Sequence, residues 1–126
     1  LFMEHGGIFI FDVNTIYKHR EILANNTFVY DCDDVYCVWQ NSLNKDDSVD
    51  ISLDIFEYED GAYYRSTEDF SEKAYPIDNY KKWLADADFE ILHIYDEMSD
   101  RDFNNKTQRA VFVARYNGYK NKSEER

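Results

Sequence analysis

Residues 6–14, GGIFIFDVN, decide the fold of this chain. The two glycines predict a turn, and the residues after them predict a strand that is apolar on both faces. A strand of this kind needs cover on both faces, which it finds inside a parallel sheet. The other residues supply little of such a sheet, so we expect these 126 residues to be part of a longer protein and to begin within it.

Outward from this strand, the next two elements are a helix and a β-rich stretch. Asn14 or Thr15 can cap a helix over 15–24, because both side chains accept hydrogen bonds from free backbone N–H groups. Residues 27–41 are rich in β-branched and aromatic side chains and contain an acidic interruption at 31–34. This pattern predicts a bulge or a bend between two short strands.

The clearest strand pattern in the chain is the alternation of apolar and polar residues from 49 to 55. Asp60-Gly61 predicts a hairpin turn, after which 62–75 returns as the partner strand. The sequence therefore predicts an antiparallel meander over 27–75. The remaining elements are a helix introduced by Pro76 over 77–87 and strands at 89–96 and 109–116, which make the chain α+β as present.

The chain is strongly acidic, with 26 acidic and 14 basic side chains and a formal net charge of −12. A field of this sign repels phosphate backbones and anionic lipid. We therefore expect neither nucleic acid nor a membrane as a partner. No apolar run reaches the roughly 20 residues of a membrane span.

The chain has two cysteines, Cys32 and Cys37, which lie five positions apart. In one strand their side chains would point to opposite faces, where they cannot bridge. Two such thiols and three histidines do not make a metal site. We expect free thiols of a cytoplasmic protein and no bound metal.

Several short motifs, in their order, resemble those of the C-terminal half of class I S-adenosylmethionine-dependent methyltransferases, in particular the bacterial small-molecule group. The similarity covers nearly the whole chain. The motifs are GGIFIFDVNTIYK at 6–18, NNTF at 25–28, WQN at 39–41, EKAYP at 72–76, ADFEILHIYD at 87–96 and VFVAR at 111–115.

The resemblance implies a partial α/β fold, the edge of a Rossmann-like sheet with strands in the order 8–14, 109–116, 89–96. It also implies that the meander of 27–75 is an insertion that caps the substrate side. We expect one domain over 1–119 and a disordered tail at 120–126.

The resemblance further implies an enzyme that uses S-adenosylmethionine in its full-length form and methylates a small molecule. Cofactor binding in the family depends on a glycine-rich loop, since only glycine permits the close backbone approach. This chain has four glycines and no Gly-x-Gly. We therefore expect no cofactor on these residues and no activity from them alone.

Ligands of open α/β sheets bind beyond the carboxyl ends of the parallel strands. The candidate substrate-binding residues at the end of the first strand are Asn14, Tyr17, Lys18 and Arg20. Lys18 or Arg20 can pair with a carboxylate or a phosphate. The alternative is that these basic side chains are solvated or paired at the surface. No catalytic residue is assigned.

Trp39, Tyr64 and Arg65 are the candidates within the meander. Aromatic rings with a guanidinium can wall a pocket that holds a planar or cationic group. The alternative is that Trp39 is the largest core side chain of the inserted sheet.

A competing hypothesis is a stand-alone α+β module that binds a ligand or mediates dimerisation without catalysis. The strand at 8–13 separates the two hypotheses, because it suits the inside of a larger sheet and makes a poor edge. Without its neighbour this strand exposes backbone groups and apolar surface. We therefore expect self-association, by default as a two-fold dimer, through this edge or its uncovered face.

Overall fold

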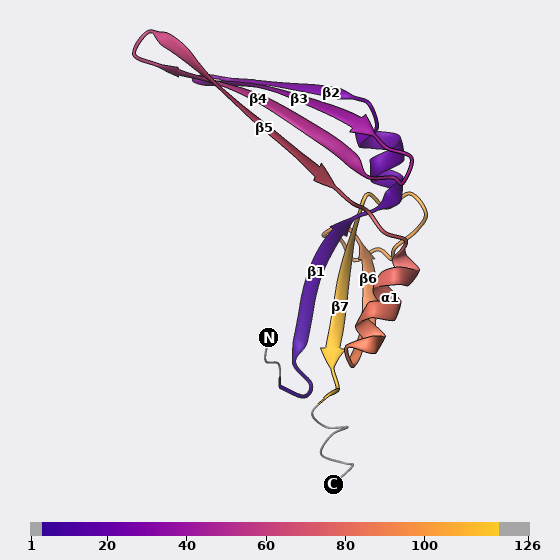
Figure 1. The fold of residues 1–126 in the computed structure, drawn as a ribbon. Helices are drawn as coiled ribbons and strands as arrows, with labels where there is room; N and C mark the ends of the chain where they lie inside the picture. Colours follow the sequence, from indigo (N-terminus) through magenta and orange to yellow (C-terminus); the bar gives the residue numbers. More distant parts are fainter. Residues whose placement is uncertain (1–3, 119–126) are drawn as a thin grey trace. The chain divides into compact units, whose positions relative to one another are not determined.

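The computed structural model describes residues 4–118, which form two compact units (Figure 1). Unit 1 contains the described residues up to Lys18 and from Tyr75 onward, and unit 2 is His19–Ala74. The tail expected at 120–126 lies outside the described residues. No helix among residues 4–118 is long and apolar enough to cross a membrane.

Unit 1 contains a three-stranded sheet of β1 (Ile8–Asn14), β6 (Phe89–Asp96) and β7 (Arg109–Tyr116). The strands lie in the order β1-β7-β6, as expected. Because β7 is antiparallel to both neighbours, β1 and β6 run parallel to each other. Their carboxyl ends therefore lie at the same edge of the sheet.

The helix α1 (Ile77–Asp86) covers one face of this sheet (Figure 1). Pro76 precedes it with φ −55°, close to the value that a helix start needs. The helix buries Leu84 against Ala110, Phe112 and Ala114 of β7. Burying a large apolar side chain of this kind contributes about 1.5–3 kcal/mol.

The alternation of β1 agrees with this one-sided cover. Phe11 and Val13 pack against the core under α1, and the Phe11 and Phe112 rings stack with centroids 4.9 Å apart. Ile8 and Ile10 point the other way and are 47% and 62% exposed. Within the described residues, only one face of the doubly apolar strand is therefore covered.

Unit 2 is a four-stranded antiparallel meander in the order β2-β3-β4-β5. Its strands are β2 (Thr27–Cys32), β3 (Val35–Leu43), β4 (Val49–Glu59) and β5 (Ala62–Glu72). The two-residue turn at 60–61 makes the hairpin that the sequence predicts, and the interruption at 31–34, predicted as a bulge or a bend, is a second two-residue hairpin turn at 33–34. Gly61 adopts φ +83°, a conformation that favours glycine.

The helix predicted over 15–24 is only partly α-helical. Residues Lys18–Leu23 form a short π-helix (η1). The N–H of Ala24 donates to the carbonyl of His19 at 2.7 Å, which is the five-residue bond of a π-turn. Ala24 then takes φ +35°, and the segment ends.

The faces of the first hairpin also differ from the prediction. The turn at 33–34 divides the β-rich stretch, and Cys32 pairs opposite Val35. Since Val35 and Cys37 are two apart in β3, both cysteines lie on one face of the sheet. The prediction of opposite faces was wrong because it treated the two strands as one; both thiols are free.

The two faces of the meander differ in chemistry. One face packs Phe28, Trp39 and Leu53 against a buried cluster of Leu23, Val49 and Ile51. The opposite face carries polar pairs, among them Ser71 and Asp50, and Thr67 and Asp54. This arrangement confirms the alternation predicted for the strand that begins at Val49.

Candidate functional site

The carboxyl end of β1 opens into a small pocket of unit 1 with a volume of about 130 Å³. This is the edge where the parallel strands β1 and β6 end, and such edges are the usual ligand-binding position in α/β sheets. The lining residues come from three segments: Thr15, Ile16 and Tyr17; Tyr75, Pro76 and Ile77; and Phe103, Asn104, Asn105 and Thr107.

Thr15 fixes the wall of this pocket where the chain leaves β1. Its buried hydroxyl donates to the carbonyl of Thr107 at 2.5 Å and accepts the N–H of Lys18 at 3.1 Å. Its own N–H donates to the carbonyl of Gln108 at 3.0 Å. Thr15 thus caps the helical turn and attaches the loop before β7 to the end of β1.

Three of the predicted site residues lie together at this edge. The Nζ of Lys18 donates to the Oδ1 of Asn14 at 3.3 Å, and Tyr17 lines the pocket. An amide, a phenol and an ammonium group can orient a polar ligand through directed hydrogen bonds. The side chains of Asn14, Tyr17 and Lys18 are all partly buried.

Arg20 is occupied within unit 2. Its Nε and Nη2 donate to the two carboxylate oxygens of Asp47 at 2.6 and 2.7 Å. This bidentate pair lowers the pKa of Asp47 below its ordinary value, first through the hydrogen bond and then through the opposite charge. For Arg20, pairing at the surface, which was the alternative to a role in binding a substrate anion, is the arrangement that its contacts show.

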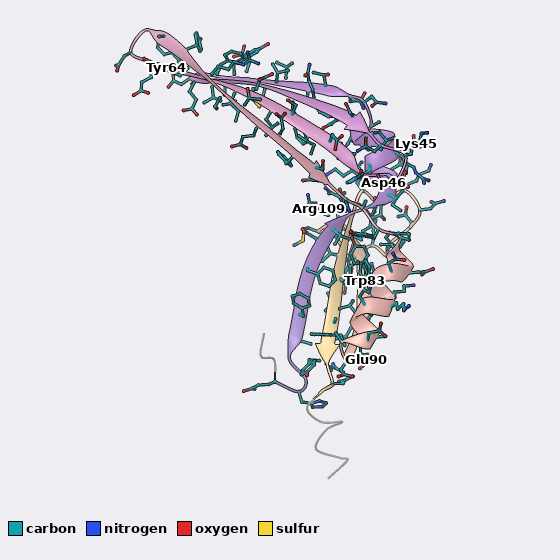
Figure 2. The ribbon with its side chains drawn as sticks, in the orientation of Figure 1. Lys45, Asp46, Tyr64, Trp83, Glu90 and Arg109 are labelled. Carbon is teal, nitrogen blue, oxygen red and sulfur yellow. The ribbon has the colours of Figure 1, made fainter. Side chains whose placement is uncertain are left out.

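The three meander candidates are not brought together. Tyr64 and Arg65 are consecutive in β5, so they point to opposite faces (Tyr64 is labelled in Figure 2). Tyr64 shares a face with Trp39 but lies opposite Glu57, whereas Trp39 lies opposite Leu53. This offset of four positions separates them by about 13 Å along the sheet.

Each of these side chains has a structural partner or is exposed. The indole N–H of Trp39 donates to the Oδ1 of Asn41 at 2.6 Å, and its ring packs 5.4 Å from that of Phe28. Arg65 donates to Asp54 at 2.8 Å. The core role considered for Trp39 is the one its contacts support.

Sequence reasoning missed the contribution of the loop before β7. The Asn104 N–H donates to the Oγ1 of Thr107 at 3.0 Å, and the Lys106 N–H donates to the Oδ1 of Asn104 at 2.9 Å. Asn and Thr at this spacing are the signal of a turn fixed by its own side chains. That signal could have marked 104–107 as an ordered wall.

The described residues offer little for a metal or a methyl donor. No group of three or more His, Cys, Asp or Glu side chains within 4–118 could hold a metal ion. Gly6 and Gly61 serve turns, with φ +82° and +83°. The sequence has no Gly-x-Gly that would let the backbone approach a nucleoside-containing methyl donor, so these residues do not fit the donor site.

Comparison with known proteins gives relatives of one kind. No family model matches the chain. It is 30% identical over 115 residues to the Putative methyltransferase GWCH70_2453 of Geobacillus sp. (strain WCH70), covering 90% of this chain and 47% of that protein. It is 26% identical to the Putative methyltransferase YqeM of Bacillus subtilis (strain 168), covering 89% and 46%.

Solved structures agree with these relatives. An S-adenosylmethionine-dependent methyltransferase from Clostridium acetobutylicum matches with a TM-score of 0.82 and 32% identity, over 91% of this chain and 46% of that one. The CcbJ methyltransferase from Streptomyces caelestis, at 14% identity and a TM-score of 0.67 over 92% and 46%, shows the shared fold.

The resemblance to S-adenosylmethionine-dependent methyltransferases is therefore confirmed, and the partial α/β fold agrees with it. The chain spans about half the length of the curated relatives it matches.

Proposed function

We propose that this chain is the C-terminal, substrate-side part of an S-adenosylmethionine-dependent methyltransferase that acts on a small molecule. The observation that carries the proposal is the 32% identity and TM-score of 0.82 with the Clostridium methyltransferase. Because the chain covers about half of that protein, the activity belongs to a larger assembly of residues.

The open side of the unit 1 sheet supports this assignment. On the face away from α1, a hollow of about 470 Å³ is lined in large part by apolar side chains, among them Ile10, Tyr95, Met98, Val111 and Val113. β1 is also an edge strand in the described sheet. A free edge and an uncovered apolar face are what a longer α/β sheet would cover.

The residues of this chain serve the acceptor side. Methyl transfer to a polar atom requires the acceptor to be held in line with the donor, so positioning is the main task of the acceptor site. We propose that Tyr17 and Lys18 orient the acceptor at the end of β1, with Asn14 holding the Lys18 ammonium in place. No step of the transfer is assigned to a donor site in these residues.

The alternative, a stand-alone binding module, predicts that the sheet of unit 1 needs no further strand and no further covering element. Its open face and free edge argue against this alternative. A cytoplasmic location stays a prediction from the free thiols, and the role of the meander as a cap stays a prediction from the resemblance.

The test is calorimetric titration of S-adenosylhomocysteine. We expect no binding to the 126-residue chain, and one-to-one binding once the part of the Clostridium protein that this chain does not cover is fused before residue 6. The Clostridium protein itself is the positive control. Binding to the chain alone, or a folded fusion that fails to bind, would contradict the proposal.

A further inference from the structure

Unit 2 carries most of the negative charge of the chain. The residues His19–Ala74 contain 14 acidic and 4 basic side chains, a formal net charge of −10 against −12 for the whole chain. A charge this uneven gives the meander a strong field of its own.

The carboxylates concentrate at the end of the meander that carries both hairpin turns, which we call the tip. The Tyr58 N–H donates to the carbonyl of Asp34 at 2.7 Å, so the turns at 33–34 and 60–61 lie at the same end. Within residues 4–118, no side chain forms an ion pair or hydrogen bond with the tip carboxylates, which are Asp31, Asp33, Asp34, Glu57, Glu59 and Asp60.

Other carboxylates of unit 2 do have such partners. Asp47 pairs with Arg20, Asp54 with Arg65, and Asp50 accepts a hydrogen bond from Ser71. The absence of partners for the described tip carboxylates is therefore local. Their charge is available to something outside the chain.

Aromatic rings occupy one face of the tip. Asp31 lies on this face, opposite Tyr36, whereas Glu57 and Glu59 point to the other face. Tyr36 and Phe56 lie opposite each other in β3 and β4, with ring centroids 6.3 Å apart. Tyr58 and Tyr63 lie opposite each other in β4 and β5, with centroids 5.2 Å apart. Phe56 and Tyr58 are two positions apart in one strand, so the four rings share a face.

These rings are open to a partner. Tyr63 is 62% exposed, Tyr58 45% and Tyr36 37%. A shallow pocket of about 460 Å³ lies beside them, lined by Asp31, Cys32, Val35, Tyr36, Phe56 and Tyr63. Monomeric proteins rarely leave a contiguous aromatic patch exposed without an interaction to serve.

The structure already contains one example of the chemistry that this face accepts. The guanidinium of Arg65 lies over the Phe56 ring, 5.8 Å from its centroid, while it pairs with Asp54. A ring face with a carboxylate beside it is the arrangement that binds a cation. Tyr36, Tyr58 and Tyr63 offer further rings on this face, near Asp31 and the carboxylates of the two turns.

We propose that the tip is a docking surface for a Lys- and Arg-rich segment of a partner protein. Charge complementarity favours a basic partner. A second copy of the chain would bring an equally acidic tip, and nucleic acid or anionic lipid would be repelled by the negative field. The surface is shallow and continues over two pairs of rings, whereas small-molecule sites enclose their ligand. The proposal does not depend on methyl transfer.

The probe for the test is a fluorescent 12-residue peptide of alternating Arg, Gly, Lys and Gly, followed by anisotropy with the full 126-residue chain. The combined change Asp33→Asn, Asp34→Asn, Asp60→Asn should weaken binding about tenfold at 0.15 M salt. The matched control is Glu21→Gln, Glu68→Gln, Asp69→Asn, which removes the same charge from exposed positions elsewhere in unit 2. It should change the affinity less than about threefold.

Two neighbouring tyrosines test the aromatic face without any change of charge. Tyr63→Ser should weaken binding about threefold, the size of one exposed cation–π contact. Tyr64→Ser should leave it unchanged, because Tyr64 is similarly exposed but points to the other face. Amide shifts on peptide addition should map to 31–36 and 56–65.

Three results would overturn the proposal. Equal losses from the two triple variants would show attraction by net charge alone. Shifts outside the tip would place the peptide elsewhere. Displacement of the peptide by tetramethylammonium at a similar concentration would identify a site for small cations instead of a protein segment.

Discussion

At the scale of single residues, the contact between η1 and the β3–β4 loop shows how side chains fix the meander. The Nδ1–H of the buried His19 donates to the carbonyl of Asp47 at 2.7 Å. The next residue, Arg20, binds the carboxylate of the same aspartate. Asp47 itself has φ +68°, a conformation that Asp and Asn tolerate better than other side chains.

The ion pair of Asp47 predicts a pH dependence of stability. The folded-state pKa lies below the ordinary value of 3.8, so the stabilisation is complete above that value. It is lost as the pH falls through the folded pKa and the carboxyl group takes up a proton. Asp47→Asn, which keeps the backbone conformation, should lower the free energy of unfolding at pH 6 and have little effect at pH 2.

Urea unfolding of both proteins between pH 2 and pH 7 measures this difference. Asp33→Asn is the control, since the Asp33 carboxylate has no side-chain partner among residues 4–118. An Asp47→Asn effect that is equal at both ends of the pH range would show that the ion pair does not stabilise the fold.

Only some of these side-chain contacts could be predicted from the sequence. The sequence could place Asn14, Tyr17 and Lys18 at the end of β1, because the three residues are close in sequence and follow that strand directly. The partner of Arg20 could not be predicted, because Asp47 lies 27 positions away and is one of many acidic residues. Long-range pairs of this kind are set by the register of the sheet, which local patterns leave open.

At the scale of elements, β1 combines a covered face with an uncovered one. Phe11 packs under α1, whereas Ile10 lies on the open face at an edge of the described sheet. Exposed edges and apolar faces drive association unless charge or a covering element blocks them.

The exposed face of β1 therefore predicts self-association of the 126-residue chain. Ile10→Lys should weaken this association about tenfold or more, because a lysine on an edge strand opposes pairing. Sedimentation over a range of concentrations measures it. The matched control is Val29→Lys, also at an exposed position of an edge strand, but in the meander. A monomer at all concentrations, or equal effects of the two variants, would contradict the prediction.

The elements themselves were largely predictable. Every strand expected from alternation and turn signals is present, with the hairpin turns at 33–34 and 60–61. The π-helical form of η1 was not predictable, because its i→i+5 bond leaves the spacing of apolar residues close to that of an α-helix. The faces of β2 and β3 were misjudged because a two-residue turn restarts the alternation.

At the scale of the molecule, the two units have separate cores. The core of unit 1 is built on Leu84 and Phe112, and that of unit 2 on Leu23, Val49 and Ile51. The two clusters share no residue. Stability need not be uniform across such a chain.

Separate cores predict separate responses to mutation. Leu84→Ala should destabilise unit 1 by about 2–4 kcal/mol, and Trp39→Ala should destabilise unit 2 by a similar amount of about 2–4 kcal/mol. Hydrogen exchange should therefore accelerate in 110–114 for the first variant and in 37–55 for the second. Acceleration of both regions by either variant would show that the chain unfolds as one cooperative body.

The pocket at the end of β1 is lined both by Thr15–Tyr17, where the chain leaves unit 1, and by Tyr75–Ile77, where it returns. A segment whose two ends meet at one point of the rest of the chain can be lengthened, shortened or exchanged without shifting the register of the remaining sheet. The meander can therefore be replaced by another segment while the three strands of unit 1 keep their pairing register. We therefore expect residues 19–74 to tolerate insertions and deletions that the strands of unit 1 do not.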